Sequence, residues 1–371
     1  MKFIIYILFF MGLFTFQSNA KISNSPISDI NILYKTIEIT HKDNIQKAID
    51  SLSIEGGKIK LLAGVYNIYT EIQLKSNVTI EGAGIDKTFL KLNKGVFHGL
   101  VAIANDENIT NLTLKNFSLY ANLNKGNAIF LESTKNYCIN NIVIKNIKVH
   151  GSTHNNIVIN SGNHGIYDDI LLSEVETFNA NDNGIIIGDS KNLKVYNCFS
   201  HDNGDKGLEF STDFAEISNN KFINNHGVNN DGVGIKFLNA NHIYMHDNLF
   251  ENNSAYAIKM SMSRKAKQYF HFENNIIKGT SIDSIAPFQA YITSTEYYPY
   301  AQVIVRNNTI IGYKGKKAIT NMMWIYKSDN TYAFGDNIIS VINKIEDLNL
   351  KKYNYEKEPL SYNVGWHSWI N

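Results

Sequence analysis

Hydrophobic and polar residues alternate in short runs along most of the chain, and the runs end at Asn, Asp or Gly. One such run, EISNNKF, has close copies at residues 216–222, 244–250, 271–277, 304–310 and 333–339. Alternation with a period of two residues is typical of β-strands. No helical periodicity of useful length separates the runs, so the pattern predicts an all-β chain.

More degenerate copies of the repeat precede these, at residues 112–119, 142–149, 170–177 and 193–200. Alignment of all copies places one residue of each in a common column: Phe117, Ile147, Val175, Cys198, Asn220, Asn248, Asn275, Asn308 and Asn337. A repeat of this length without helices predicts a β-solenoid with one coil per repeat. We expect the stacked Asn residues to bond to neighbouring coils and therefore to be structural.

Both ends of the repeat array carry segments that we interpret as caps. Residues 43–52, DNIQKAIDSL, predict a short amphipathic helix with Asp43 or Asn44 as N-cap. Such a helix would cover the first coil, because an exposed strand edge invites pairing with another chain. The last 50 residues lose the repeat and contain Trp324, Trp366 and Trp369, which predict a C-terminal cap.

The segments IQKAID, GGKIKLLAGVY and LKSNVTIEGAG resemble the N-terminal region of the pectin-lyase-like β-helix superfamily. With the repeats, the resemblance covers roughly residues 40–345. It implies a right-handed parallel β-helix with an N-terminal capping helix. The superfamily includes lyases, hydrolases, epimerases and phage tailspikes, so the resemblance is specific for the fold rather than for one activity.

The first 20 residues have the features of a secretory signal peptide. Lys2 precedes an apolar stretch over residues 3–16, and Ser18-Asn19-Ala20 resembles a cleavage site. No later segment reaches transmembrane length. We therefore expect a secreted, periplasmic or cell-surface protein. We divide the chain into a signal peptide (1–20), an N-terminal segment (21–42), the β-helix with its N-terminal cap (43–345) and a C-terminal cap (346–371).

The charge and the cysteines of the chain lead to three expectations. The formal net charge of +1 gives no basic surface for nucleic acid, so we expect no nucleic-acid partner. We also expect a monomer. An exported protein can form disulfides. However, Cys138 and Cys198 fall at different places within their coils, so we predict two free, buried thiols.

The strand after the turn in each coil has an apolar–polar–apolar centre, such as Ile235-Lys236-Phe237. The apolar residues are expected to point inward and the central residue outward, because neighbours on a strand face opposite sides. Along the chain this outward column contains Phe130, Val158, Ile186, Glu209, Lys236, Lys259 and Gln289. Parallel strands stack about 4.8 Å apart. Glu209, Lys236 and Lys259, here called the charged row, are therefore predicted to be contiguous.

The turns that lead into these strands are acidic. Residues 179–184, 201–207 and 225–232 contain Asp182, Asp202, Asp205 and Asp231, and Asp189 follows the first of these turns, so five carboxylates are expected near the charged row. Two interpretations remain open. The row is either an ordinary solvated face, on which mixed charges prevent edge pairing, or a groove for an acidic polysaccharide.

A uronate polymer would suit such a groove chemically. β-Elimination requires the C5 carboxylate to be neutralised, the C5 proton to be removed and the glycosidic oxygen to be expelled. Ca²⁺ held by carboxylates can serve the first requirement and a lysine the second. Lys259 would lower the pKa of Lys236 by like-charge repulsion, and Glu209 would raise it unless a cation takes up its charge.

Residues 225–238, NHGVNNDGVGIKFL, resemble the segment of family 9 pectate lyases that carries the catalytic lysine. Residues 201–210, HDNGDKGLEF, resemble the preceding coil, which binds Ca²⁺ in that family. The resemblance implies that Lys236 is the base. Three aspartates of the family fall on Asp205, Lys206 and Glu209, and a fourth falls on Asn183, beside Asp182. Lys206 and Asn183 are departures from the family, because a cation and an amide replace carboxylates.

We therefore predict a uronan lyase that acts on a pectate-like or alginate-like polymer, with Lys236 as its base. The predicted Ca²⁺ ligands are Asp205, Glu209, Asp182 and Asp202. The predicted substrate-binding residues are Lys259, Arg264, Lys206, His226 and Asp231. A C5-epimerase or a glycoside hydrolase on the same face, and a non-catalytic carbohydrate-binding solenoid, remain alternatives.

Overall fold

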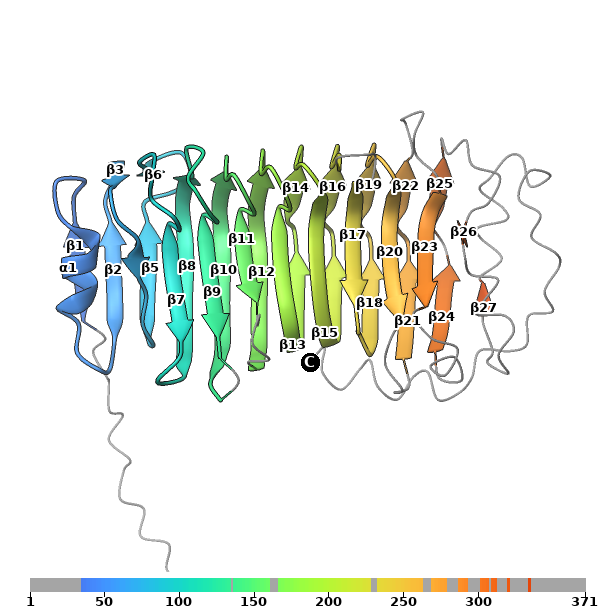
Figure 1. Cartoon of the computed structure of the whole chain (residues 1–371), viewed down its shortest axis with the longest axis horizontal. Helices are drawn as coiled ribbons and strands as arrows, with labels where there is room; N and C mark the ends of the chain where they lie inside the picture. Colours follow the sequence, from blue (N-terminus) through green and yellow to red (C-terminus); the bar gives the residue numbers. More distant parts are fainter. Residues whose placement is uncertain are drawn as a thin grey trace, which may run out of the picture. The chain divides into compact units, whose positions relative to one another are not determined.

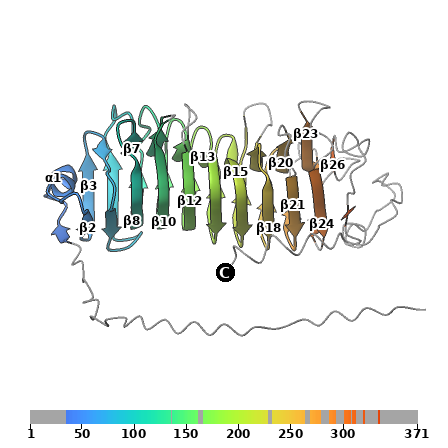
Figure 2. The same cartoon turned by 90° about the horizontal axis from the view of Figure 1, so that it is seen from below.

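The computed structural model describes residues 35–134, 136–160, 166–227, 232–262 and 268–278, and further strand segments at 286–292, 301–306, 308–311, 319–320 and 333–334. Within these residues the chain consists of parallel-paired β-strands and one short helix. Most strands pair with a strand one coil earlier and another one coil later, so the coils lie side by side along one axis (Figures 1 and 2). This is a parallel β-helix, so the predicted all-β solenoid is confirmed.

The strands of the coils form three parallel ladders, which we call the first, second and third faces. The first face contains β4 (Ile72–Gln73), β7 (Leu100–Ala104), β9 (Ile129–Ser133), β11 (Ile157–Asn160), β17 (Val233–Leu238), β20 (Tyr256–Met262), β23 (Ala286–Ile292) and β26 (Ile319–Thr320), and the N-terminal halves of β13 (Ile185–Tyr196) and β15 (Lys206–Ser218).

The second face contains β1 (Thr36–Ile39), β2 (Gly57–Leu61), β5 (Val78–Gly82), β18 (His242–His246), β21 (Gln268–Glu273), β24 (Ala301–Arg306) and β27 (Ala333–Phe334), the C-terminal halves of β13 and β15, and the N-terminal halves of β8 (Ile109–Tyr120), β10 (Cys138–His150) and β12 (Ile166–Phe178). The third face contains the C-terminal halves of β8, β10 and β12, and also β3 (Gly64–Ile68), β6 (Thr88–Leu92), β14 (Phe199–His201), β16 (Lys221–Ile223), β19 (Leu249–Glu251), β22 (Ile276–Lys278) and β25 (Thr309–Ile311).

From β8 onward, a single residue in the left-handed region makes the corner between the second and third faces in seven of the described coils. The corner residues are Asn116, Asn146, Glu174, Asn197, Asn219, Asp247 and Asn274, all with φ between 48° and 63°. Asn and Asp tolerate this conformation better than other L-residues. The chain therefore turns from one face to the next within one residue, which explains why Asn or Asp recurs at this corner.

The residue after each corner points inward and stacks on its copies. In the later coils this residue is a buried Asn, and the side-chain amide of Asn248 donates to Oδ1 of Asn275 at 2.9 Å. Asn275 donates in turn to Asn308 at 2.9 Å. The predicted Asn ladder is confirmed from Asn220 to Asn308. Asn337, its predicted last member, lies outside the described residues.

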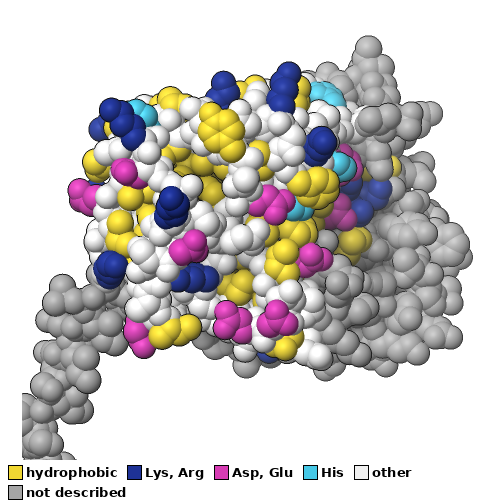
Figure 3. Space-filling view, turned by 60° about the vertical axis from the view of Figure 1, so that its left-hand side comes forward, with side chains coloured by type: hydrophobic (Ala, Val, Ile, Leu, Met, Phe, Trp, Pro, Cys, Tyr) yellow, Lys and Arg dark blue, Asp and Glu magenta, His cyan; other side chains and the backbone are white. Residues whose placement is uncertain are grey.

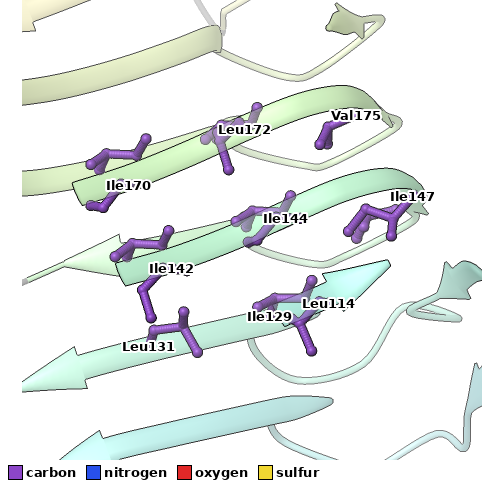
Figure 4. Packing of buried hydrophobic residues seen from close by; sticks show 14 of the residues in the cluster. Leu114, Ile129, Leu131, Ile142, Ile144, Ile147, Ile170, Leu172 and Val175 are labelled. Carbon is purple, nitrogen blue, oxygen red and sulfur yellow. The ribbon is translucent and has the colours of Figure 1, made fainter. Parts of the chain in front are cut away.

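Stacked aliphatic side chains fill the interior. Leu114, Ile144 and Leu172 occupy the same position in successive coils and are fully buried, and Ile129 and Leu131 lie across from them (Figure 4). Each fully buried side chain of this kind contributes about 2 kcal/mol of hydrophobic stabilisation. In the early coils Ile147 and Val175 replace the Asn of the inward column, so the ladder there is apolar.

Helix α1 (Ile45–Asp50) is shorter than the predicted span of residues 43–52. Its N-cap is Asn44, whose side-chain oxygen accepts from the backbone N–H of Lys47 at 2.9 Å. Ile45, Ala48 and Ile49 are buried against the core. That this helix closes the end of the solenoid stays a prediction. Strand β1, which precedes it, pairs with β2.

Several predictions concern residues that are not described. The signal peptide over residues 1–20 and the C-terminal cap over 346–371 lie outside the described residues. No helix among the described residues has the length and apolar character needed to cross a membrane. Both cysteines are free thiols, as predicted, but only Cys198 is buried, whereas Cys138 is half-buried.

Candidate functional site

The charged row lies on the first face, in the order that the sequence predicts. Glu209 of β15 pairs in register with Lys236 of β17, which pairs with Lys259 of β20. On the N-terminal side, Ile186 of β13 pairs with Glu209. The flanking side chains Leu208, Phe210, Ile235, Phe237, Ile258 and Met260 are buried in the core. The alternation therefore turns the charged row outward.

Glu209 is the centre of the ionic contacts in the charged row. Its Oε1 lies 3.0 Å from Nζ of Lys236, and both side chains keep about a fifth of their surface exposed (19% and 22%). Its Oε2 lies 3.5 Å from Nζ of Lys206. The carboxylate thus bridges two ammonium groups, one within its own coil and one in the next.

Lys206 is the most buried charged residue of this cluster. Only 8% of its side chain is exposed, and its ammonium donates to the carboxylate of Asp205 as well as approaching Glu209. Burial pulls the pKa of Lys206 down, but the hydrogen bond to Asp205 and the negative charges of Glu209, Asp205 and Asp182 outweigh it and raise the pKa overall. The side chain is therefore a firmly protonated internal cation.

The turn that carries Asp205 and Lys206 is fixed from the preceding coil. The backbone N–H of Asp205 donates to the carbonyl of Asp182 at 3.2 Å, and that of Lys206 donates to Oδ1 of Asn183 at 3.2 Å. Asn183 is buried and also donates to Oδ1 of Asn155 and of Asp182. Asn183 therefore belongs to a ladder of the fold, which explains the amide at this position.

The ladder of Asn183 is one that sequence reasoning missed. Asn127, Asn155 and Asn183 are bonded through their side chains at the turn before the first face, and Asn203, Asn225 and Asn253 form a similar set. Within each set the members are one coil apart in the sequence, at spacings of 22 to 28 residues. The same periodicity that revealed the first Asn column could have revealed both.

Two predicted site residues have other surroundings. The carboxylate of Asp202 pairs with Nδ1 of His201 at 2.6 Å. Asp202 and the exposed His226 line a groove of about 810 Å³ at the ends of the third-face strands. The structure therefore groups Asp202 and His226 with this groove, and Asp205, Lys206, Glu209 and Lys236 with one another. Arg264 and Asp231 lie outside the described residues, so their predicted roles stay predictions.

A ladder of rings borders this groove. Tyr120, His150, Phe178 and His201 follow one another in successive coils, with centroids 4.6 to 5.0 Å apart and planes within 15° of parallel. Because the rings stack on each other, they present edges rather than faces to a ligand in the groove. Sequence reasoning missed this ladder, although each ring lies three residues after a member of the inward column.

Calcium was predicted at the carboxylates around Glu209, and the residues present do not fit it. Among the described residues, no three His, Cys, Asp or Glu side chains converge so as to hold a metal ion. The ammonium of Lys206 lies between the carboxylates of Asp205 and Glu209 instead. A dication about 4 Å from an ammonium would be repelled by about 8 kcal/mol, twice the value for two unit charges at an effective dielectric of about 20.

The family of the chain follows from the repeat and the fold together. The family model "Right handed beta helix region" matches residues 98–277 and 170–339, which together span more than half of the chain. The chain therefore belongs to this family, and its parallel β-helix is right-handed. No curated protein sequence matches the chain.

Solved structures with similar folds include a tailspike domain, a lyase and an epimerase module. The enzymatically active domain of bacteriophage CBA120 tailspike protein 2 has a TM-score of 0.52 and 14% identity, over 78% of this chain and 43% of its own. The PL6 family alginate lyase AlyGC has a TM-score of 0.50 and 14% identity, and the match covers 74% of this chain and 39% of that chain. The A-module of Azotobacter vinelandii mannuronan C-5 epimerase AlgE4 has a TM-score of 0.43 and 15% identity, and the match covers 78% of this chain and 94% of that chain. At these identities the likeness shows the fold alone.

This chain spans less than half the length of the tailspike domain and of the alginate lyase. Nothing about their activity therefore transfers to it directly. The arguments below depend on the side chains of the charged row and on Lys206.

Proposed function

We propose that this protein is an exported, monomeric polysaccharide lyase that cleaves a uronate-containing polymer by β-elimination on its first face. The observation that carries the proposal is the charged row, Glu209, Lys236 and Lys259, held in register on neighbouring coils, with Lys206 of the same strand as Glu209 in contact with that carboxylate. It combines cations that can bind a polyanion with an amine that can act as a base. The alginate lyase and the tailspike domain, built on the same fold, lend support by analogy only.

Binding of an acidic polymer requires cations that its carboxylates can reach. Lys236 and Lys259 are partly exposed on the first face, at neighbouring positions of the outward column. On the N-terminal side of Glu209 the column becomes apolar, with Ile186 and Val158. Carboxylates would lie against the lysines, and the apolar face of a sugar ring would pack on Ile186, which is partly exposed, whereas Val158 is buried. On the view that brings the N-terminal coils forward, acidic, basic and hydrophobic side chains are interspersed (Figure 3).

In the proposed reaction, Lys236 acts as the general base after its ammonium has released one proton to solvent. The amine takes the proton from C5 of a uronate, and the electron pair of the C5–H bond forms the C4–C5 double bond. The C4–O bond breaks, and the glycosidic oxygen leaves with its electron pair and is protonated by solvent. Lys259 balances the charge that builds on the C5 carboxylate as the proton leaves.

Glu209 has a positioning role in this scheme. Its carboxylate contacts the Lys236 ammonium at 3.0 Å and so fixes the direction in which the lysine extends. Proton abstraction requires the base within about 3 Å of the C5 hydrogen-bearing carbon in a bound substrate. A lysine with four rotatable side-chain bonds gains most from such a restraint.

The test uses the purified full chain with pectate and alginate as substrates, followed by ultraviolet absorbance of the unsaturated uronate. A steady rise in absorbance with either polymer is the expected result. Exchange of the C5 hydrogen with deuterium from solvent, without new reducing ends or absorbance, would identify an epimerase. New reducing ends without absorbance would identify a hydrolase. Binding of the polymer without any chemistry would identify a carbohydrate-binding solenoid, and each of these three outcomes would overturn the lyase.

A further inference from the structure

We propose that Lys206 is a built-in cation that does the work of a bound divalent metal at this site, so that the site neither binds nor needs Ca²⁺. The part of this inference that concerns catalysis rests on the proposed function. The part that concerns metal binding is independent of the proposed function. It assigns Lys206 as a positioning residue, which acts on the reaction through Glu209 and Lys236.

The first argument is the place of Lys206 among the carboxylates. Its ammonium contacts both Asp205 and Glu209, and the carboxylate of Asp182 lies close enough to act on it electrostatically. Asp182, Asp205 and Glu209 are also three of the four carboxylates that the sequence suggested as Ca²⁺ ligands, and the fourth, Asp202, pairs with His201 instead. The ammonium of Lys206 therefore lies among the carboxylates that were predicted to bind the metal ion.

The second argument is burial. The Lys206 side chain is only 8% exposed, whereas Lys236 keeps 22% of its surface. An ammonium that is taken out of water must keep its ionic partners, because an unpaired buried charge is strongly destabilising. Lys206 therefore has no solvated position to which it could easily withdraw to make room for a metal ion.

The third argument is the ionic chain that leads from Lys206 to the proposed base. Lys206 contacts one oxygen of Glu209, and Lys236 contacts the other oxygen at 3.0 Å. Rotation of the Glu209 carboxylate is thus restrained from both sides. Removal of the Lys206 charge would leave Glu209 held by Lys236 alone and would leave one excess negative charge beside the binding place of an anionic substrate.

The metal-binding experiment compares the full-length wild-type protein with Lys206→Asp by calorimetric titration with CaCl₂ and by thermal unfolding with and without chelator. The wild type should show no saturable heat and no change in Tm. Lys206→Asp replaces the cation with a carboxylate and should gain Ca²⁺ binding, with a Kd of roughly 10⁻⁵ to 10⁻³ M, and a calcium-dependent rise in Tm. Saturable binding to the wild type would overturn the proposal, as would a folded Lys206→Asp variant that binds no Ca²⁺.

A second variant covers the case in which Lys206→Asp does not fold. Lys206→Met keeps most of the side-chain volume and removes only the charge. We expect kcat to fall about 100-fold with a much smaller change in KM, because the base loses its orientation. Lys206→Arg should restore part of the rate, and chelator should leave the wild-type rate unchanged. A wild-type rate abolished by chelator and restored by Ca²⁺, or full activity in Lys206→Met, would overturn the proposal.

The two proposals fail in different ways. If no polyuronide is degraded, the proposed lyase function is wrong, yet the calorimetric comparison still decides whether Lys206 stands in the place of a cation. If the polymer is degraded only with Ca²⁺ present, the lyase function holds and the inference about Lys206 is wrong.

Discussion

Glu209 and Lys236 occupy equivalent positions on neighbouring coils, and their side chains meet at 3.0 Å on the outer surface of the first face. A β-helix repeats its backbone every coil, so any two residues in register have Cβ atoms about 4.8 Å apart. A carboxylate next to a lysine in register therefore forms an ion pair without special backbone geometry. The stacking of the fold itself therefore sets the position of the proposed base.

Replacement of Lys236 by Ala should abolish elimination, since the C5 proton would lose its acceptor. General-base catalysis contributes about 10² to 10⁴ in rate, so kcat should fall by at least about 100-fold. The measurement is the initial rate of unsaturated product formation on the polymer that the wild type degrades best. Lys221→Ala, at an exposed lysine of β16 on the third face, is the matched control and should retain the wild-type rate. Wild-type turnover by Lys236→Ala would remove Lys236 from the mechanism.

Lys259→Gln should weaken substrate binding more than it slows the chemistry. Lys259 pairs in register with Lys236 and is partly exposed, so we expect it to contact a substrate carboxylate. The loss of one such contact, worth about 1 kcal/mol, should raise KM about fivefold. The effect should shrink as ionic strength rises, because salt screens exposed charges. A KM unchanged at low salt would show that Lys259 does not bind the polymer.

The course of the backbone and the charged row could be predicted because both depend on simple periodicities. Alternation with period two decides which residue of each strand points outward, and the repeat length decides which residues share a register. Together they place Glu209, Lys236 and Lys259 in one row, as the structure does. No knowledge of the turns is needed for that step.

The surroundings of the row could not be predicted, because they depend on the turns. Asp202 and Asp205 are three residues apart, yet Asp202 lies at a left-handed corner with φ of 51° and pairs with His201, while Asp205 pairs with Lys206. The strand phase also matters. Lys206 lies on the same side of the strand as the inward residues Leu208 and Phe210, because they are two residues apart, and this explains its burial. Its long side chain lets the ammonium reach Glu209.

The two cysteines should react with thiol reagents at very different rates. Burial raises the pKa of the Cys198 thiol to about 12, and the side chain is almost fully enclosed. Since the thiolate is the reactive form, Cys198 should be inert in the native protein. Half-buried Cys138 should react, giving one thiol before denaturation and two after it. Cys138→Ser should remove the native reaction. Two thiols of equal native reactivity would contradict the described packing of Cys198.

His246 should make stability depend on pH in a defined direction. Its Nδ1 lies 2.6 Å from Asp247, and its Nε2 lies 3.8 Å from Glu216, with Glu273 in register on the next coil. Burial pulls the pKa of His246 down, but the carboxylates of Glu216 and Asp247 outweigh it and raise the pKa above the ordinary 6.5. The stabilisation is therefore complete below about pH 6.5 and is lost as pH rises through the raised value.

The measurement is the difference in Tm between wild type and His246→Gln as a function of pH. This difference should be largest below about pH 6.5 and should shrink above neutral pH. His242→Gln is the matched comparison, because burial lowers the pKa of His242. The folded protein favours the neutral ring of His242, so the Tm of the wild type should rise relative to that of His242→Gln as pH rises. The same pH trend for both variants would contradict the opposite surroundings of the two rings.

Asn248→Ala should be among the most destabilising substitutions outside the hydrophobic core. Oδ1 of Asn248 accepts from the backbone and the side chain of Asn220, each at 2.9 Å, and its amide donates to Asn275 and to the carbonyl of Ile217. The substitution leaves these buried groups without partners, at a cost of about 3 kcal/mol.

The control for Asn248→Ala is Asn181→Ala, at an exposed turn position, which should change the free energy of unfolding by no more than about 0.5 kcal/mol. Asn248→Val separates hydrogen bonding from volume. Val175 and Ile147 fill the corresponding position in earlier coils, where the neighbours in the column are also apolar. At position 248 a Val fills the space but leaves the same polar groups unpaired, so it should cost nearly as much as Ala. Chemical denaturation of the three variants measures these differences. A near-neutral Asn248→Val would show that the column needs only volume.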